Sequence, residues 1–213
     1  MKIVISAGPT REPIDAVRFI TNHSSGKMGY ALAIAAAESA MEVILISGPT
    51  NLPQPANVEL IKVETAAQMG SAVKIAASDA DIVIMSAAVA DYRPLNILPG
   101  KLKKTSGNLL LELKRTEDIL ASLGRVKPTG QILCGFAAET ANLISNAKEK
   151  LSRKNLDWII ANDVSKSGQG FAGDRNAVTM INATGQQIEL PLADKILLAQ
   201  RIIAEIIPKE NDC

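Results

Sequence analysis

Short apolar runs alternate with longer segments of helical periodicity along most of this 213-residue chain. The pattern predicts buried strands over residues 2–6, 42–47, 58–63, 81–87, 132–137 and 157–161, and helices over residues 25–40, 65–78, 140–154 and 193–207. A hairpin is expected from residues 177–181 and 187–190, because the turn between them is rich in Asn and Gly. Strands that alternate with helices pair in parallel and carry helices on both faces, so we expect an α/β protein with a mostly parallel sheet.

The segment 92–116 breaks this alternation. It contains Pro94, Pro99 and two glycines around a cluster of three lysines at 101–104. These residues predict a loop or a hairpin arm rather than another strand–helix unit. A lysine cluster usually forms a solvated face, but an arm that carries three lysines can also hold a triphosphate.

The segment 8–29 is the strongest candidate for a binding loop. It joins a predicted strand to a predicted helix, where α/β proteins bind ligands, and plain connections there usually have about 2–6 residues. It is rich in polar side chains and contains the chain's only histidine, His23. Gly26 and Gly29, at the start of the helix, suit the close approach of an anionic group such as a phosphate.

The common nucleotide-binding motifs are absent from this loop. A P-loop needs a Ser or Thr where Met28 stands, and the dinucleotide fingerprint needs a second glycine where Gly8 is followed by Pro9 and Thr10. The strand at 42–47 also ends without the acidic residue that holds a ribose. These absences disfavour a nicotinamide-dependent reductase.

Two further clusters could serve either ligand binding or the structure of the fold. Residues 86–92 combine small side chains with Asp91, whose carboxylate could accept hydrogen bonds from a ligand or cap a helix. Lys150 and Lys154 lie four residues apart on one face of a predicted helix, and by themselves they are typical of structural cations near a helix C-terminus.

Composition limits the class of protein. A chain of this length suits one domain over residues 1–213, and 47% apolar residues supply a substantial core. The net charge of +1 disfavours binding to nucleic acid or to a membrane surface, and no apolar run approaches the roughly 18 residues of a transmembrane helix. Met1 leads directly into a predicted strand, and Cys134 and Cys213 offer no disulfide framework. We therefore expect a cytoplasmic protein.

Seven segments together closely resemble bacterial phosphopantothenoylcysteine synthetase. They are 8–29 (GPTREPIDAVRFITNHSSGKMG), 87–93 (AAVADYR), 101–104 (KLKK), 135–140 (GFAAET), 154–157 (KNLD), 161–164 (ANDV) and 173–176 (GDRN). The resemblance implies a Rossmann-like three-layer sandwich and a homodimer in which an arm at about 92–116 crosses between subunits. In many bacteria this synthetase is fused to a flavin-dependent phosphopantothenoylcysteine decarboxylase, so such a domain or a separate decarboxylase is an expected partner.

The resemblance also implies a reaction. The family joins 4′-phosphopantothenate to L-cysteine in coenzyme A biosynthesis, and bacterial members use CTP through an acyl-cytidylate intermediate. Mg²⁺ would arrive with the triphosphate, and the sequence shows no dedicated protein cage for a metal. The alternatives that we keep are a nicotinamide-dependent reductase and a non-catalytic nucleotide-binding module.

Matching the family's motifs position by position implies a set of site residues. Asn22, Arg18 and Lys101 would be catalytic, with Asn22 on the acyl-phosphate intermediate and Lys101 on the triphosphate. Asn22, Gly26 and Ala88 would bind phosphopantothenate. The residues that match nucleotide contacts are Met85, Ser86, Ala87, Asp91, Lys101, Phe136, Lys150 and Lys154, and this match reverses the structural interpretation of the last two.

Overall fold

The central sheet dominates the computed structural model, which describes residues 1–104, 106–139, 142–163 and 173–208. Eight strands of the described residues form this sheet in the order β12-β11-β10-β9-β6-β1-β4-β5. Their bounds are β1 Lys2–Ala7, β4 Glu42–Ser47, β5 Glu59–Lys62, β6 Ile82–Met85, β9 Ile132–Glu139, β10 Trp158–Asp163, β11 Arg175–Asn182 and β12 Gln187–Asp194. All neighbours from β5 to β10 pair in parallel, whereas β11 and β12 add an antiparallel edge.

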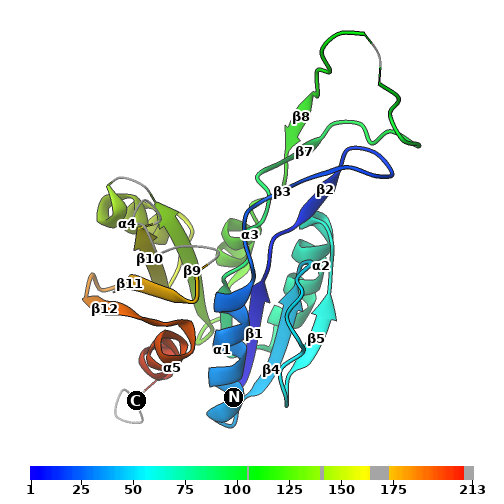
Figure 1. The fold of residues 1–213 in the computed structure, drawn as a ribbon. Helices are drawn as coiled ribbons and strands as arrows, with labels where there is room; N and C mark the ends of the chain where they lie inside the picture. The colour runs from blue at the N-terminus through cyan, green and yellow to red at the C-terminus, as the bar shows by residue number, and fades with distance from the viewer. Residues whose placement is uncertain (105, 140–141, 164–172, 209–213) are drawn as a thin grey trace.

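Helices cover both faces of the sheet (Figure 1). The helix α1 (Lys27–Glu38) packs with α5 (Lys195–Ile206) on one face, where a cluster of buried residues includes Ile3 and Ile5. On the other face lie α2 (Ala66–Ala76), α3 (Ile119–Val126) and α4 (Leu143–Arg153), around a cluster that includes Val4. Successive side chains of β1 therefore enter opposite cores, which explains why the strand is apolar throughout. The predicted α/β class with three layers is confirmed.

The local sequence signals account for most element boundaries. Thr65, the first residue of the predicted helix 65–78, caps α2 in a capping box in which its side chain accepts from the Gln68 backbone amide and the Gln68 side chain accepts from the Thr65 amide. The observed β4 has the predicted bounds, and the hairpin of β11 and β12 is longer than predicted. The first two residues of the predicted helix 140–154, and Cys213, lie outside the described residues.

The sequence analysis missed two kinds of element. Within the segment 8–29, the chain forms a small hairpin of β2 (Arg11–Pro13) and β3 (Phe19–Thr21). The helix α3 was not predicted, although Asp118 caps its N-terminus by accepting from the Ala121 amide at 3.0 Å.

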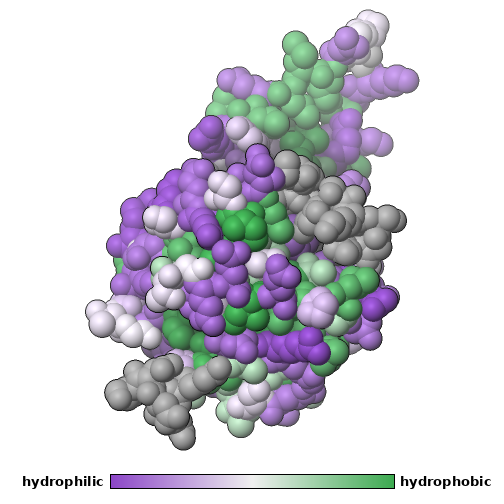
Figure 2. All heavy atoms as spheres, turned by 90° about the vertical axis from the view of Figure 1, so that its left-hand side faces the viewer, coloured by the Kyte–Doolittle hydropathy of each residue, from purple (hydrophilic) through white to green (hydrophobic). Residues whose placement is uncertain are grey.

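The arm predicted at 92–116 is a two-stranded ribbon of β7 (Tyr92–Pro94) and β8 (Leu113–Arg115) that projects beyond the sheet beside the β2–β3 hairpin (Figure 1). Apolar side chains gather on this projection (Figure 2). Leu110 is 91% exposed, and Leu109, Ile97 and Tyr92 are also exposed. Such a patch is unusual on a monomer and marks an interaction surface.

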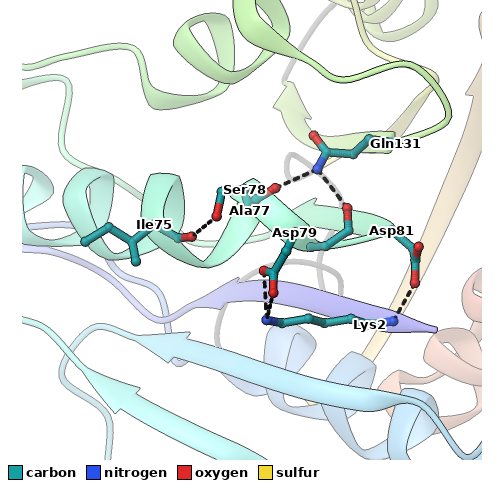
Figure 3. Close-up of polar contacts among 8 residues, drawn as sticks. Lys2, Ile75, Ala77, Ser78, Asp79, Asp81 and Gln131 are labelled. Atoms are coloured by element: carbon teal, nitrogen blue, oxygen red, sulfur yellow. Dashed lines mark hydrogen bonds and ion pairs between the residues drawn. The ribbon is translucent and has the colours of Figure 1, made fainter.

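At the amino-terminal edge of the parallel strands, polar groups hold the elements together (Figure 3). The Lys2 ammonium contacts both carboxylate oxygens of Asp79 at 2.8 Å, and the Lys2 amide donates to Asp81 at 2.7 Å. The buried Gln131 side chain donates to the carbonyls of Ala77 and Ala80 at 2.7 and 2.8 Å. In the described part of the chain, no helix is long and apolar enough to cross a membrane.

Candidate active site

A cleft of about 840 Å³ opens at the opposite edge, where the parallel strands end. Its position follows from the strand order, since the chain leaves β1 toward β4 and β5 and then returns to β6 on the other side. Open α/β sheets bind ligands at such a reversal, outside the carboxyl ends of the strands. The volume suits a small-molecule ligand.

The loops that follow β1 and β6 are joined along their backbones. The Ala88 amide donates to the Gly8 carbonyl at 2.9 Å, and the Thr10 amide donates to the Ala88 carbonyl at 3.3 Å. Gly48, which follows β4, lies directly against the first of these loops, because a Cβ atom there would lie 1.8 Å from the Pro9 carbonyl oxygen. The two loops therefore form one wall of the cleft.

Asn22 and Ala88, both expected to bind phosphopantothenate, contact each other on this wall. The Asn22 side-chain amide donates to the carbonyl oxygens of Ala88 and Val89 at 3.0 and 3.3 Å. These bonds fix the orientation of the amide in an exposed position on the cleft. His23 is also on the cleft wall.

The N-terminus of α1 lies in the same wall. Gly26 has φ +78° and no side chain caps the helix, so its first amides are available to an anion. Gly29 lets the helix pack directly on β1, because a Cβ atom would lie 2.5 Å from that of Ala7. Both glycines line the cleft.

Cations gather beside this helix end. Lys27 forms an ion pair with Asp174 at 2.5 Å, and this contact lowers the pKa of the Asp174 carboxyl. Lys195, the first residue of α5, lines the cleft although it is only 6% exposed. Burial lowers its pKa, the nearby charge of Lys27 lowers it further, and Asp174 opposes both effects.

Most of the expected nucleotide residues also line the cleft: Met85, Ser86, Ala87, Asp91, Phe136 and Lys154. The alternative role for Asp91 as a helix cap is wrong, because the next element is the strand β7. Lys154 contacts both carboxylate oxygens of Asp118 at 2.8 Å. Partial burial raises the pKa of Asp118, but the bonds from Lys154 and Ala121 outweigh burial and hold this pKa below its usual range.

Three expected residues lie outside the cleft wall. Lys150 is on α4, one turn before Lys154, and does not line the cleft. Arg18 and Lys101 belong to the projecting hairpin and arm, where the Arg18 guanidinium binds Asp15 and the Leu102 carbonyl. The chain therefore brings Arg18 and Lys101 close to each other but not to its own cleft.

Other residues of the cleft wall had no predicted role. Asn162, Asn176 and Lys195 enter from the carboxyl-terminal third of the chain, and Glu117 and Asp118 from the start of α3. These residues could have been found in the sequence as polar residues at the ends of strands or the starts of helices, such as Asn162 near the end of β10. Over the described ranges, no cluster of three or more His, Cys, Asp and Glu side chains could hold a metal ion. Mg²⁺ therefore stays a prediction.

A mostly parallel sheet with a polar, cation-bearing cleft at its switch point defines an α/β protein of the Rossmann-like class. The chain matches, over residues 1–209, the family described as "DNA/pantothenate metabolism flavoprotein C-terminal domain", and it belongs to that family. This confirms the resemblance found in the sequence.

Relatives give the same result. The chain is 52% identical over 205 residues to the coenzyme A biosynthesis bifunctional protein CoaBC of Bacillus subtilis (strain 168), covering 96% of this chain and 50% of the relative. It is 45% identical over 215 residues to CoaBC of Escherichia coli (strain K12), covering 100% of this chain and 53% of the relative. The chain thus spans about half the length of these relatives. A crystal structure of a CoaBC C-terminal domain matches with a TM-score of 0.83 and 46% identity, over 96% of this chain and 93% of that one.

Proposed function

We propose that this chain joins 4′-phosphopantothenate to L-cysteine with CTP in coenzyme A biosynthesis, through an acyl-cytidylate. One observation carries the proposal: Asn22 lines the same cleft of about 840 Å³ as an uncapped helix N-terminus with two lysines and as Lys154. A substrate with a phosphate at one end and a carboxylate at the other suits this set of groups.

The chemistry needs stabilisation of negative charge. A carboxylate oxygen of phosphopantothenate attacks the α-phosphorus of CTP, and pyrophosphate leaves. The cysteine amine then attacks the acyl carbon, CMP leaves, and the amine loses a proton to water or phosphate. Because like charges meet in the first step, fixed donors and cations supply most of the acceleration.

The substrate phosphate is assigned to the start of α1. There the amides after Gly26, together with Lys27 and Lys195, offer donors and positive charge. From this end the substrate extends along Ala88 to Asn22. The Asn22 amide has no basic group, and its NH₂ group donates to the Ala88 and Val89 carbonyls. With substrate bound, it would exchange the longer of these bonds for one to the acyl oxygen as charge develops there.

The nucleotide is assigned to the other half of the cleft. The small residues Ser86 and Ala87 let a flat base approach the backbone, and Met85, Asp91 and Phe136 line the same cleft. Lys154 supplies a cation for phosphate, and Lys150 would join it on the same helix. Mg²⁺ would enter with the triphosphate, held by phosphate oxygens and water rather than by a protein cage.

The arm is assigned to a homodimer. Arg18 and Lys101 are remote from their own cleft, and the arm that carries Lys101 exposes a row of apolar side chains. A second copy of the chain would cover this surface and receive both cations at its cleft, where Lys101 would neutralise the triphosphate and Arg18 the intermediate. A flavin-dependent decarboxylase, fused or separate, is the proposed further partner, and the cytoplasm is the proposed location.

Product analysis tests the proposal. The purified protein is incubated with 4′-phosphopantothenate, Mg²⁺, L-cysteine and either CTP or ATP, and products are identified by mass spectrometry. We expect phosphopantothenoylcysteine and CMP with CTP only. Product with ATP would overturn the assigned base pocket, binding of CTP without turnover would favour a non-catalytic module, and calorimetric binding of NADP would favour a reductase.

A further inference from the structure

We propose that Asp15 is a positioning residue that fastens Arg18 to the base of the arm, so that Arg18 and Lys101 are presented together as one unit. The inference rests on the proposed function for the role of the two cations. The contacts that define the unit are independent of that function.

The Asp15 carboxylate is fully buried and divides its bonds between two tasks. The oxygen Oδ1 accepts from the amides of Val17 and Arg18, both at 2.8 Å, which closes a local turn. The oxygen Oδ2 accepts from Arg18 Nε at 3.0 Å, from Arg18 Nη2, and from the Leu102 amide at 3.0 Å. One oxygen therefore serves the turn and the other serves the guanidinium and the arm.

The arm also accepts a hydrogen bond from Arg18. The Leu102 carbonyl accepts from Arg18 Nη2 at 3.0 Å, so a single residue of the arm binds both members of the ion pair. A third bond runs from the Leu98 amide to the Ile14 carbonyl at 3.0 Å. These contacts join the hairpin to a segment more than 80 residues later in the chain. Lys101 is adjacent to Leu102, so its backbone position is set by the same contacts.

The charge on Asp15 is permanent at working pH. The hydrogen bonds from Arg18 are the largest cause, and those from Leu102 and Val17 add to it, so the pKa of Asp15 lies far below its usual range. Charge-assisted bonds of this kind are short and directional, and here two donors of the planar guanidinium converge on the single oxygen Oδ2. A buried carboxylate that is only a turn residue would not need its second oxygen for a remote segment.

Substitution separates the two tasks. In Asp15→Asn one oxygen remains for the turn, but the NH₂ group faces other donors, Arg18 and the Leu102 amide. In Asp15→Glu the local turn is strained, whereas the carboxylate can still reach Arg18 and Leu102. A turn role predicts that Asn is tolerated better than Glu, and a fastening role predicts the reverse order.

The test measures arm protection by hydrogen exchange over 92–116 and pyrophosphate release in the full chain. We expect Asp15→Asn to lose arm protection and to slow pyrophosphate release by about 10- to 100-fold, because small misplacements of catalytic groups have effects of this size. Asp15→Glu should retain more of both. Leu102→Pro removes the arm amide, together with the leucine side chain and some backbone freedom, and should lose arm protection in a chain whose Asp15–Arg18 pair is intact. Asp79→Asn, the same change in an exposed ion pair at the far edge of the sheet, is the control and should match the wild type.

The inference would be overturned if Asp15→Asn kept as much arm protection and pyrophosphate release as Asp15→Glu, or more. Wild-type arm protection in Leu102→Pro would also overturn it. Loss of arm protection in the expected order in a chain that makes no phosphopantothenoylcysteine would support the fastening role and overturn only the proposed function.

Discussion

The two edges of the parallel sheet use the same kinds of residue in different ways. At the amino-terminal edge, Lys2 pairs with Asp79 at 2.8 Å (Figure 3), and at the carboxyl-terminal edge, Lys154 pairs with Asp118 at the same distance. Neither residue of the first pair lines the cleft, whereas both residues of the second pair lie on the wall of this cleft of about 840 Å³. The two ion pairs have the same distance, so what makes the second a candidate for ligand binding is the cleft beside it.

Backbone hydrogen bonding also differs between the two edges. At the amino-terminal edge, which we call the closed edge, the Gln131 side chain satisfies two carbonyls and the Lys2 amide has a carboxylate partner. At the open edge, the helix α1 begins at Gly26 without a side-chain cap. Donors that a helix leaves unused are a binding site for an anion, whereas donors that are already paired contribute to stability alone.

The largest effect should come from Asn22→Asp. A carboxylate would face the carbonyls of Ala88 and Val89 and would repel the charge that develops on the acyl oxygen. We expect kcat to fall by about 100- to 1,000-fold, the usual effect of losing such a donor. Steady-state pyrophosphate release measures it.

Asn57→Asp is the matched control, because Asn57 is exposed on a turn with φ +58° that Asp also tolerates. It should keep wild-type kcat. Wild-type kcat in Asn22→Asp would remove Asn22 from the reaction.

Lys154→Gln compared with Lys2→Gln tests the two edges directly. Each variant removes a lysine from a lysine–aspartate pair, but only Lys154 faces the cleft. We expect the Kd for CTP, measured by calorimetry, to rise about 10- to 100-fold in Lys154→Gln, as for the loss of a hydrogen bond to a charged group. Lys2→Gln should leave this Kd unchanged. Equal Kd values in the two variants would contradict the claim that only the carboxyl-terminal edge binds CTP.

Gln131→Ala should lower the stability of the fold and leave catalysis unchanged. It leaves two buried carbonyls without their donor, so the free energy of unfolding should fall by about 1–3 kcal/mol in urea denaturation. At temperatures where the variant is folded, kcat should be that of the wild type.

Gln54→Ala removes a single hydrogen bond, to the Val58 carbonyl, at a more exposed site and should cost less stability. A large loss of kcat in folded Gln131→Ala would show that the closed edge takes part in catalysis.

The smallest effect we expect is a difference between Asp79→Asn and the wild type in how the free energy of unfolding falls in acid. The pKa of Asp79 is lowered, first by its hydrogen bond from Lys2, so this carboxylate stabilises the fold above its unfolded pKa of about 4. The contribution disappears as pH falls through the lower, folded pKa. Urea denaturation from pH 7 to pH 2.5 should show a shallower acid loss for Asp79→Asn than for the wild type. Parallel curves would mean that the Lys2–Asp79 pair does not contribute.

Local signals predicted the elements well because their causes lie within a few residues. The bounds of β4 and the capping of α2 by Thr65 follow from an apolar run and from a Thr with a Gln three residues later. The helix α3 also carried such signals, since Asp118 precedes Ile119, Leu120 and Leu123 at helical spacing. It was missed because no element was predicted for residues 117–131, although these signals were present.

The site was less predictable because its causes are distant. The resemblance supplied Asn22 and Lys154, but the meeting of Asn22 with Ala88 depends on the backbone bonds that Ala88 makes with Gly8 and Thr10, about 80 residues earlier in the chain. Lys195 comes to the cleft because α5 begins at that edge after the β11–β12 hairpin. No local pattern at Lys195 distinguishes it from any other lysine at a helix start.

The central claim is that nucleotide binds only at the carboxyl-terminal edge of the sheet. Hydrogen exchange of the full chain with and without CTP and Mg²⁺ tests it most directly. The account predicts slower exchange over residues 85–91, 116–120 and 150–154, with no change over 75–81 and 131–133. Protection confined to the amino-terminal edge, or none at the carboxyl-terminal edge with saturating CTP, would contradict it.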